Sequence, residues 1–452
     1  MRTGRQGTET GPDTANRDPV IDLVRFVCLV LVLVGHSMMV SPVLHPDGTV
    51  TTENTLAIQN WFEPIIWIFM VMPLFFVTGG VTGLQSWRRL KEAGGTAAQF
   101  IRGRLLRLVR PATALLATMA LGLAVAGVLG VDQEVVQLMA TGAAMPLWFL
   151  AAYLAAQLNI PVLAALHARA PWLTIGLLTA LVVAVDCLRG ALPDLANINL
   201  VFVWCAVQQL GFLAVDGHFS RLSRSGLLGM AVAAHLLLGV VTGLGLYRGN
   251  MLVNLNPPNL TLVILGVAQL AALELARPVL APLARVRWVS RLLTVAGSRS
   301  LTVYLWHLPL LVAMSGLLLL APIPKPGPGT AAWWWSRPLV VLALVLLLLP
   351  VAAAFGHLEE RTTAMHTLRC RPAAAGAAVV VVFIPVADAA LSGLSLGLLA
   401  AGAVCFYVAV LLLGGFSPGH RRAAVSLGPR KGKARGRTRG KKGRRGIASG
   451  VK

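Results

Sequence analysis

Charged side chains are scarce in this chain, and their scarcity excludes a soluble globular protein. Only 12% of the 452 residues are Asp, Glu, Lys or Arg, whereas 56% are hydrophobic. The mean hydropathy is +0.75. Soluble domains carry a charge on about a quarter of their residues. The composition therefore predicts an integral membrane protein.

Cysteine is also rare, and the few cysteines form no recognisable pattern. Cys28, Cys187, Cys205 and Cys405 lie in or at the ends of apolar runs, and Cys370 lies in a basic segment. None has the spacing of a metal site, and no disulfide framework is implied. We expect small apolar packing roles for them and no metal cofactor.

We also expect no removable targeting segment. Residues 1–19 are polar, and no A-x-A-like cleavage site follows the first apolar run. That run is long enough to cross a bilayer, for which about 20 apolar residues are needed. Twelve stretches meet this length, near residues 20–40, 62–84, 108–130, 146–166, 172–188, 199–216, 227–246, 258–276, 300–320, 338–356, 373–391 and 395–414. The sequence therefore predicts an all-α polytopic membrane protein with about twelve transmembrane helices.

The basic residues are unevenly divided between the two sets of loops. With the N-terminus in the cytoplasm, the cytoplasmic loops hold 21 Lys and Arg besides the C-terminal tail. The opposite loops hold only four, namely Arg189, Arg248, Lys325 and Arg337. Cytoplasmic loops are the ones enriched in Lys and Arg. We therefore expect both termini in the cytoplasm, and a multi-pass protein of the bacterial plasma membrane.

Three ionisable residues, Asp22, Arg25 and His36, lie inside the first apolar run. Asp or Arg at the centre of a spanning helix costs about 2.5–3.5 kcal/mol, so such residues are usually paired or functional. Arg25 and His36 are eleven residues apart, which places them on one helix face with about 16 Å of rise between them. We expect His36 to act on a proton near neutral pH and Arg25 to contact a ligand. A hydrogen-bonded structural histidine and a self-neutralising Asp22–Arg25 pair are the alternatives.

A basic segment precedes the third span. Arg102, Arg104, Arg107 and Arg110 are spaced by two, three and three residues, so several of them are expected on one helix face. Guanidinium groups bind phosphates through paired hydrogen bonds. The cluster thus predicts a site for a nucleotide-containing cofactor or an anionic lipid headgroup, although positive-inside topology alone explains part of it.

Polar residues in the later spans are fewer. Tyr304 and His307 lie on one helix face at the start of the ninth span, within SRSLTVYLWHLPLL. Gln208 and Gln209 are expected in helix–helix hydrogen bonds, as is His235.

Taken in order, these segments resemble the family-3 membrane acyltransferases, which O-acylate surface polysaccharides, peptidoglycan and some macrolides. The matching elements are Asp22–Leu23–Val24–Arg25 with His36, Phe75–Phe76–Val77, Arg102 to Arg110–Pro111, Leu147–Trp148–Phe149–Leu150 and Tyr304–Leu305–Trp306–His307. One departure is at Thr78, Gly79 and Gly80, where the family commonly has Ser-Gly.

The resemblance implies an acyltransferase that takes its acyl group, most simply acetyl, from cytoplasmic acyl-CoA. The acceptor would be a hydroxyl of a carbohydrate, a cell-envelope glycan or a secondary metabolite. By position, His36 would be the essential histidine, with Arg25 and Asp22 in the catalytic set. Arg102, Arg104, Arg107, Arg110, Tyr304 and His307 would handle the donor.

The resemblance also implies an organisation of the chain. A core of ten helices would cover residues 18–356, after a cytoplasmic segment at 1–17. The chain departs from the family in two additional transmembrane helices, which we expect within 357–419. Residues 420–452 hold 13 of the 39 Lys and Arg and no acid, which predicts a disordered cytoplasmic tail. We expect this tail to attract anionic lipids at about 1 kcal/mol per basic residue, and we expect no specific nucleic-acid partner.

A proton-coupled secondary transporter is the alternative function. Twelve spans and buried ionisable residues suit one. However, the segment GLQSWRR after the second span lacks the acidic residue of the common transporter loop motif, and no internal repeat is visible.

Overall fold

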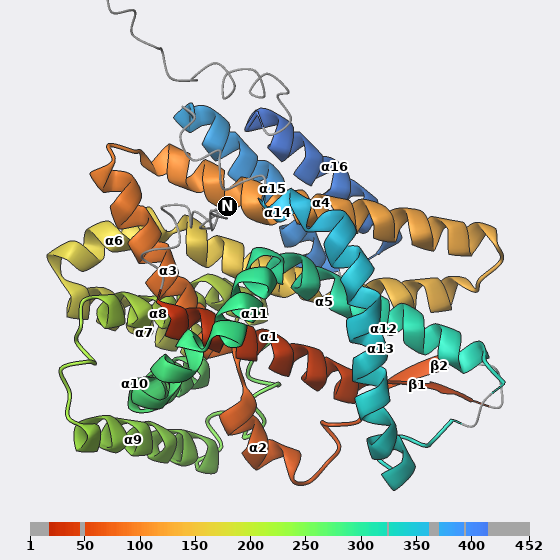
Figure 1. The fold of residues 1–452 in the computed structure, drawn as a ribbon, viewed down its shortest axis with the longest axis horizontal. Helices are drawn as coiled ribbons and strands as arrows, with labels where there is room; N and C mark the ends of the chain where they lie inside the picture. Colours follow the sequence, from red (N-terminus) through yellow and green to blue (C-terminus); the bar gives the residue numbers. More distant parts are fainter. Residues whose placement is uncertain (1–17, 46–49, 323–324, 361–369, 393–394, 415–452) are drawn as a thin grey trace, which may run out of the picture.

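The computed structural model describes residues 18–45, 50–322, 325–360, 370–392 and 395–414. The predicted N-terminal segment 1–17 and the basic tail 420–452 lie outside these ranges. Within them the regular secondary structure is helical, apart from one antiparallel hairpin of two strands and an isolated bridge (Figure 1). The all-α prediction is confirmed.

The elements follow one another in this order: α1 (Pro19–Met39), β1 (Val40–Leu44), β2 (Val50–Asn54), α2 (Phe62–Phe69), α3 (Met72–Glu92), α4 (Ala97–Val128), α5 (Gln133–Leu158), α6 (Ile160–Arg169), α7 (Pro171–Leu188), η1 (Pro193–Ile198), α8 (Asn199–Val215), α9 (Arg224–Gly243), α10 (Leu260–Arg285), α11 (Arg287–Ser298), α12 (Ser300–Leu320), α13 (Ala331–Phe355), α14 (His357–Glu360), α15 (Pro372–Ser392) and α16 (Leu396–Leu412).

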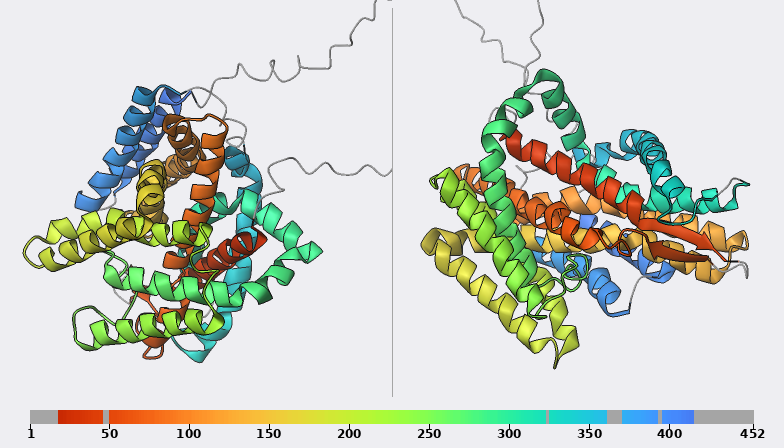
Figure 2. Two further views of the ribbon diagram at one scale, coloured as in Figure 1. Left: turned by 90° about the vertical axis from the view of Figure 1, so that its left-hand side faces the viewer. Right: turned by 90° about the horizontal axis from the view of Figure 1, so that it is seen from below.

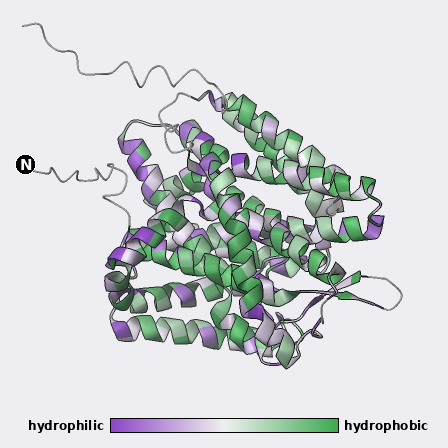
Figure 3. Cartoon of the chain, turned by 45° about the vertical axis from the view of Figure 1, so that its right-hand side comes forward, coloured by the Kyte–Doolittle hydropathy of each residue, from purple (hydrophilic) through white to green (hydrophobic). Residues whose placement is uncertain are grey.

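Eleven helical segments in the described ranges are long and apolar enough to cross a membrane. Ten of the twelve predicted spans each fall on one helix, whereas 62–84 covers α2 and α3, and 146–166 covers α5 and α6. Helix α16, at 17 residues, is shorter than the eleven segments. Figure 3 shows hydrophobic residues along the long helices and hydrophilic ones gathered toward helix ends and connections. The protein is therefore a multi-pass membrane protein.

Helix α1 has a strong start signal and a fixed position. Asp18 is its N-cap and accepts a hydrogen bond from the Val20 amide, and Pro19 occupies the first helical position. The same Asp18 carboxylate pairs with Arg277 of α10 at 2.6 Å. Helices α3, α10, α11, α12 and α13 pack around α1 (Figures 1 and 2). One side chain, Asp18, therefore both caps α1 and links it to α10.

Close backbone contact holds α3 against α8. A Cβ atom built on Gly80 would lie 2.2 Å from the Gln208 carbonyl oxygen, and one on Gly211 would lie 2.2 Å from the Val77 oxygen. Small residues permit such approaches between membrane helices. The contact also stacks the Phe76 ring on the Trp204 indole of α8, with ring centroids 4.2 Å apart.

Two of the predicted helix–helix hydrogen bonds are present. Gln157 of α5 donates to Gln208 of α8 at 2.9 Å, and Gln209 lies 2.6 Å from the His167 ring of α6. The expectation for His235 was wrong: its ring is exposed on α9 and bonds to a carbonyl of its own helix.

The last two helices, α15 and α16, pack side by side and lie along α4 (Figures 1 and 2). Arg102 of α4 donates from Nε to the carbonyl oxygen of Leu413, just beyond α16, at 2.9 Å. The capping box of Thr96 and Gln99 starts α4 one turn earlier. The segment that carries the arginines is thus anchored by the C-terminal helices.

Candidate active site

Two histidines from distant parts of the chain form a pair. His36 lies one turn before the end of α1, and His307 lies on α12, 271 residues later. The His36 Nδ1 and His307 Nε2 atoms are 2.7 Å apart. The two rings are nearly parallel, with an interplanar angle of 8° and centroids 5.0 Å apart. His36 is half-buried, whereas His307 is completely buried.

The hydrogen bonds around the pair determine which nitrogens carry protons. His307 Nδ1 contacts the carbonyl oxygen of Tyr304, and a carbonyl oxygen can only accept. In neutral His307 the proton therefore sits on Nδ1, and Nε2 presents a lone pair. His36 Nδ1 donates to that lone pair, so His36 Nε2 is unprotonated and free to accept a proton. A carbonyl and a second imidazole thus orient His36 as a base.

Two residues of this arrangement, Tyr304 and His307, were expected to handle the donor cofactor, and that role stays a prediction. The structure places His307 in contact with His36, and the Tyr304 carbonyl oxygen in contact with His307. His307 belongs to the histidine pair, and Tyr304 orients it through the main chain.

Arg25 lies eleven residues before His36 on α1 and contacts α3. Its Nη1 donates to the Thr82 hydroxyl at 3.1 Å, and its guanidinium lies over the Phe75 ring, 4.9 Å from the centroid. The partners that the structure gives Arg25 therefore lie on α3, and Tyr153 of α5 is also within its reach.

Two arginines of α4 join Arg25. Arg104, Arg107 and Arg25 lie within electrostatic range of one another and of Tyr153 on α5. The Arg104 guanidinium lies 5.0 Å from the centroid of the Phe100 ring, and its Nε is buried with no hydrogen-bond partner among the described residues. We call Arg25, Arg104 and Arg107 the arginine cluster.

Of the other two predicted arginines, Arg102 lies on a different face of α4. Arg102 points to α16, where its Nε binds the Leu413 carbonyl. Arg110 is buried, at 8% exposure, one helical turn further along α4 than Arg107. At 100° per residue, Arg102 lies about 160° around the helix from Arg104. Several of the four arginines were expected on one helix face, and Arg102 therefore lies on a different face from Arg104.

Aromatic rings connect the arginine cluster with the histidine pair. Phe75, which lies under Arg25, contacts Phe149 of α5 with ring centroids 5.3 Å apart. Phe149 contacts Tyr304 at 4.7 Å, and Tyr304 contacts His307 at 5.4 Å. These rings come from three helices. They form a continuous aromatic wall between the arginine cluster and the histidine pair.

A buried carboxylate fixes the start of α12. Glu359 of α14 accepts hydrogen bonds from the Leu301 and Thr302 amides in the first turn of α12, and its Oε1 lies 3.8 Å from Arg107. Burial raises the pKa of the Glu359 carboxyl, and Arg107 opposes that shift. Glu359 thus links the helix of His307 to the arginine cluster.

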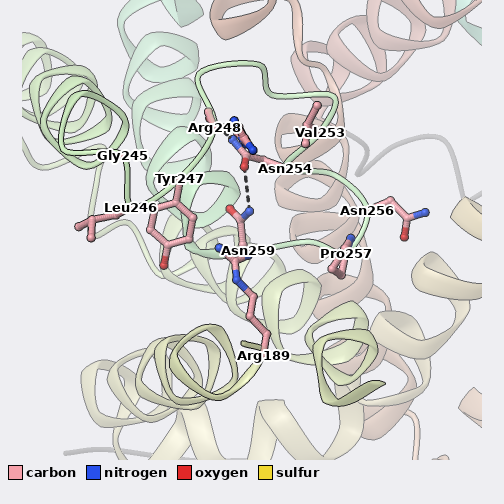
Figure 4. Close-up of a pocket in the computed structure, with 10 residues that line it drawn as sticks. All are labelled: Arg189, Gly245, Leu246, Tyr247, Arg248, Val253, Asn254, Asn256, Pro257 and Asn259. Atoms are coloured by element: carbon pink, nitrogen blue, oxygen red, sulfur yellow. Dashed lines mark hydrogen bonds between the residues drawn. The ribbon is translucent and has the colours of Figure 1, made fainter. Parts of the chain in front are cut away.

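A separate cavity of about 230 Å³ lies in the loop between α9 and α10 (Figure 4). Arg189, Tyr247, Arg248 and Asn254 are among its lining residues. The Arg189 guanidinium lies 5.3 Å from the Tyr247 ring centroid, and Asn259 donates to Asn254 at 2.9 Å. This polar pocket, which we call the outer pocket, contains two of the four basic residues predicted to lie outside the cytoplasm.

The predictions from sequence did not include Tyr153, Thr82 or Glu359. Tyr153 follows Phe149 by one helical turn, so its position on the same face was readable in principle. Thr82 and Glu359 carried no signal, because hydroxyl and carboxyl residues near span ends are common. No group of three or more potential metal ligands occurs in the described parts of the chain.

The profile of the acyltransferase domain family matches residues 18–357, about three-quarters of the chain. The match covers α1 through α13 and therefore both ends of the site. No curated protein and no solved structure gives a significant match. Motifs in α3, α5 and α12 that suggested the family supply the rings of the aromatic wall, and the motif in α1 supplies Arg25 and His36 at its two ends. This chain belongs to the family 3 acyltransferases and is an enzyme that transfers acyl groups other than aminoacyl groups.

Proposed function

We propose that this membrane acyltransferase transfers an acyl group, most simply acetyl, from acyl-CoA to a hydroxyl, with His36 as general base. The observation that carries the proposal is the chain from the Tyr304 carbonyl through His307 to His36, which leaves His36 Nε2 as the free basic nitrogen. General-base catalysis by a positioned histidine contributes about 10²–10⁴-fold to a rate.

The reaction is written as one addition and one elimination. His36 Nε2 takes the proton of the acceptor hydroxyl while its oxygen attacks the thioester carbonyl carbon. The carbon–sulfur bond then breaks, and the leaving CoA sulfur receives that proton. His307, as a neutral acceptor for His36 Nδ1–H, stabilises the imidazolium that forms in between. Acyl transfer through His36 itself would use the same free nitrogen as nucleophile.

The arginine cluster is the proposed donor site. CoA carries several phosphates, and Arg25, Arg104 and Arg107 offer three guanidiniums with one carboxylate, Glu359, at 3.8 Å from the last. The buried Nε of Arg104, which has no partner among the described residues, is a donor available to a ligand. Arg25 and His36 are separated by about 16 Å of helix rise, the distance that the pantetheine arm would have to bridge along the aromatic wall.

The acceptor is proposed to be a carbohydrate, a cell-envelope glycan or a secondary metabolite at a bacterial plasma membrane. His36 lies near the end of α1 that leads into the hairpin, opposite the arginine cluster. The predicted topology places that end outside the cytoplasm, where such hydroxyls are found. Proton-coupled transport, the alternative from sequence, is not favoured by any contact in the site.

The test uses the purified full-length chain in lipid nanodiscs with labelled acetyl-CoA. Glycans, lipids and metabolites from cells with and without the protein are compared by mass spectrometry for a missing acyl mass, and the acceptor so found is assayed. His36→Ala is expected to lose at least a hundredfold in kcat. His235→Ala is the matched control, because His235 is exposed and bonds only within α9. A His36→Ala protein that inserts normally and transfers at the wild-type rate contradicts the proposal.

A further inference from the structure

Helix α11 has an apolar ridge that no other part of the described chain covers. Its inner residues Val289 and Leu293, 4% and 7% exposed, pack against Leu23 of α1. Trp288 and Val295, on the neighbouring face, are 66% and 62% exposed. One part of the apolar face of α11 therefore packs on α1, and the other part points away from the protein.

The position of α11 makes it a surface helix of the membrane. It connects α10 and α12, both long enough to span a bilayer, and it packs on the first half of α1. Twelve residues extend over about 18 Å, whereas the hydrocarbon core is about 30 Å thick. Helix α11 therefore cannot cross the membrane, and it lies at the face where α1 begins.

Arginines flank the exposed ridge. Arg285, Arg287 and Arg291 are all exposed, and none of them forms an ion pair within the described residues. At 100° per residue, Arg291 lies about 40° around the helix from Val295 and about 60° from Trp288. No acidic residue occurs between Arg285 and Ser298. A cationic stripe therefore borders the apolar ridge directly.

We propose that α11 is a binding site for anionic phospholipid, with Arg287 and Arg291 on the headgroup phosphate and with Trp288 and Val295 among the acyl chains. Interfacial helices of this kind bury their apolar face at the boundary between headgroups and chains, and their arginines contact anionic headgroups. A protein partner would meet the same ridge, but it would need acidic residues within the membrane interface, where anionic lipid is already present. Lipid is therefore the occupant that both the charge and the position favour.

The basic tail complicates any measurement of total lipid binding, so the test reads the site locally. A photo-cross-linking phenylalanine analogue replaces Val295 in the full-length chain, in nanodiscs containing phosphatidylcholine and phosphatidylglycerol. Adducts are identified by mass spectrometry, and their phosphatidylglycerol-to-phosphatidylcholine ratio is compared with the ratio supplied. We expect phosphatidylglycerol to be enriched, and we expect R287Q/R291Q to reduce the enrichment about tenfold.

The double variant R221Q/R224Q is the matched control. Arg221, between α8 and α9, and Arg224, the first residue of α9, are exposed arginines that do not belong to α11. This control should keep the full enrichment. Equal adduct ratios in R287Q/R291Q and in the control would overturn the proposal, as would a protein adduct as the main product in native membranes. Neither outcome depends on acyl transfer, so the result is independent of the proposed enzymatic reaction.

Discussion

Replacing His307 by phenylalanine removes the hydrogen-bond acceptor of His36 and leaves a ring of similar size in its place. His36 Nδ1–H then loses its partner at 2.7 Å in a buried site. In the reaction, the His36 imidazolium can no longer donate this hydrogen bond. A hydrogen bond that involves a charged group is worth about 1.5–3 kcal/mol. At 1.36 kcal/mol per factor of ten, kcat should fall by roughly 10- to 150-fold.

The assay is steady-state transfer from labelled acetyl-CoA, with kcat and the KM for acetyl-CoA determined separately. His307 does not belong to the arginine cluster, so the KM for the donor should change by less than about threefold. The double variant His36→Ala/His307→Phe should be no slower than His36→Ala, because His307 acts through His36. A further tenfold loss in the double variant, or a rise in donor KM with unchanged kcat, would refute this reasoning.

Three further predictions concern the rest of the molecule. Gly80→Ala should lower stability by about 1–3 kcal/mol in thermal unfolding, because its Cβ would meet a backbone oxygen at 2.2 Å, whereas Gly229→Ala, with open space around it, should not. Arg104→Gln should raise the KM for acetyl-CoA about tenfold, and Arg102→Gln should leave it unchanged. The hydrogen bond from Arg88 is the main cause of the lowered pKa of Asp216. The ionised carboxylate therefore stabilises the folded protein above about pH 4, and this stabilisation is lost as the pH falls through the lowered pKa. In Asp216→Asn, the thermal unfolding midpoint should depend less on pH in that range.

The membrane helices were predictable because their signal is local. A run of about 20 apolar residues has few alternatives in a bilayer, since its backbone groups must be bonded within the helix. Every predicted span is helical for this reason. The boundaries were less predictable: the stretch expected at 62–84 is two helices, α2 and α3, and α4 extends from Ala97, well before the predicted start at 108.

Half of the site could be recognised in the same way. Arg25 and His36 stand out because ionisable groups in an apolar run are costly, and their spacing on one helix places them on one face. The arginine-rich start of α4 was also visible. However, Arg102 and Arg104 differ only in their position around the helix, and that difference has meaning only once the neighbours of α4 are known.

The composition, the apolar runs and the order of a few motifs were sufficient to determine the class of this protein and its family. They also pointed to Arg25 and His36 as residues of the candidate site. All of these are properties of the chain taken one segment at a time. Only the tertiary structure decided three contacts: His36 with His307, Arg25 with Thr82, and Glu359 with the first turn of α12. These contacts join residues 57 to 271 positions apart, and packing between helices, which no single segment encodes, brings them within hydrogen-bond distance.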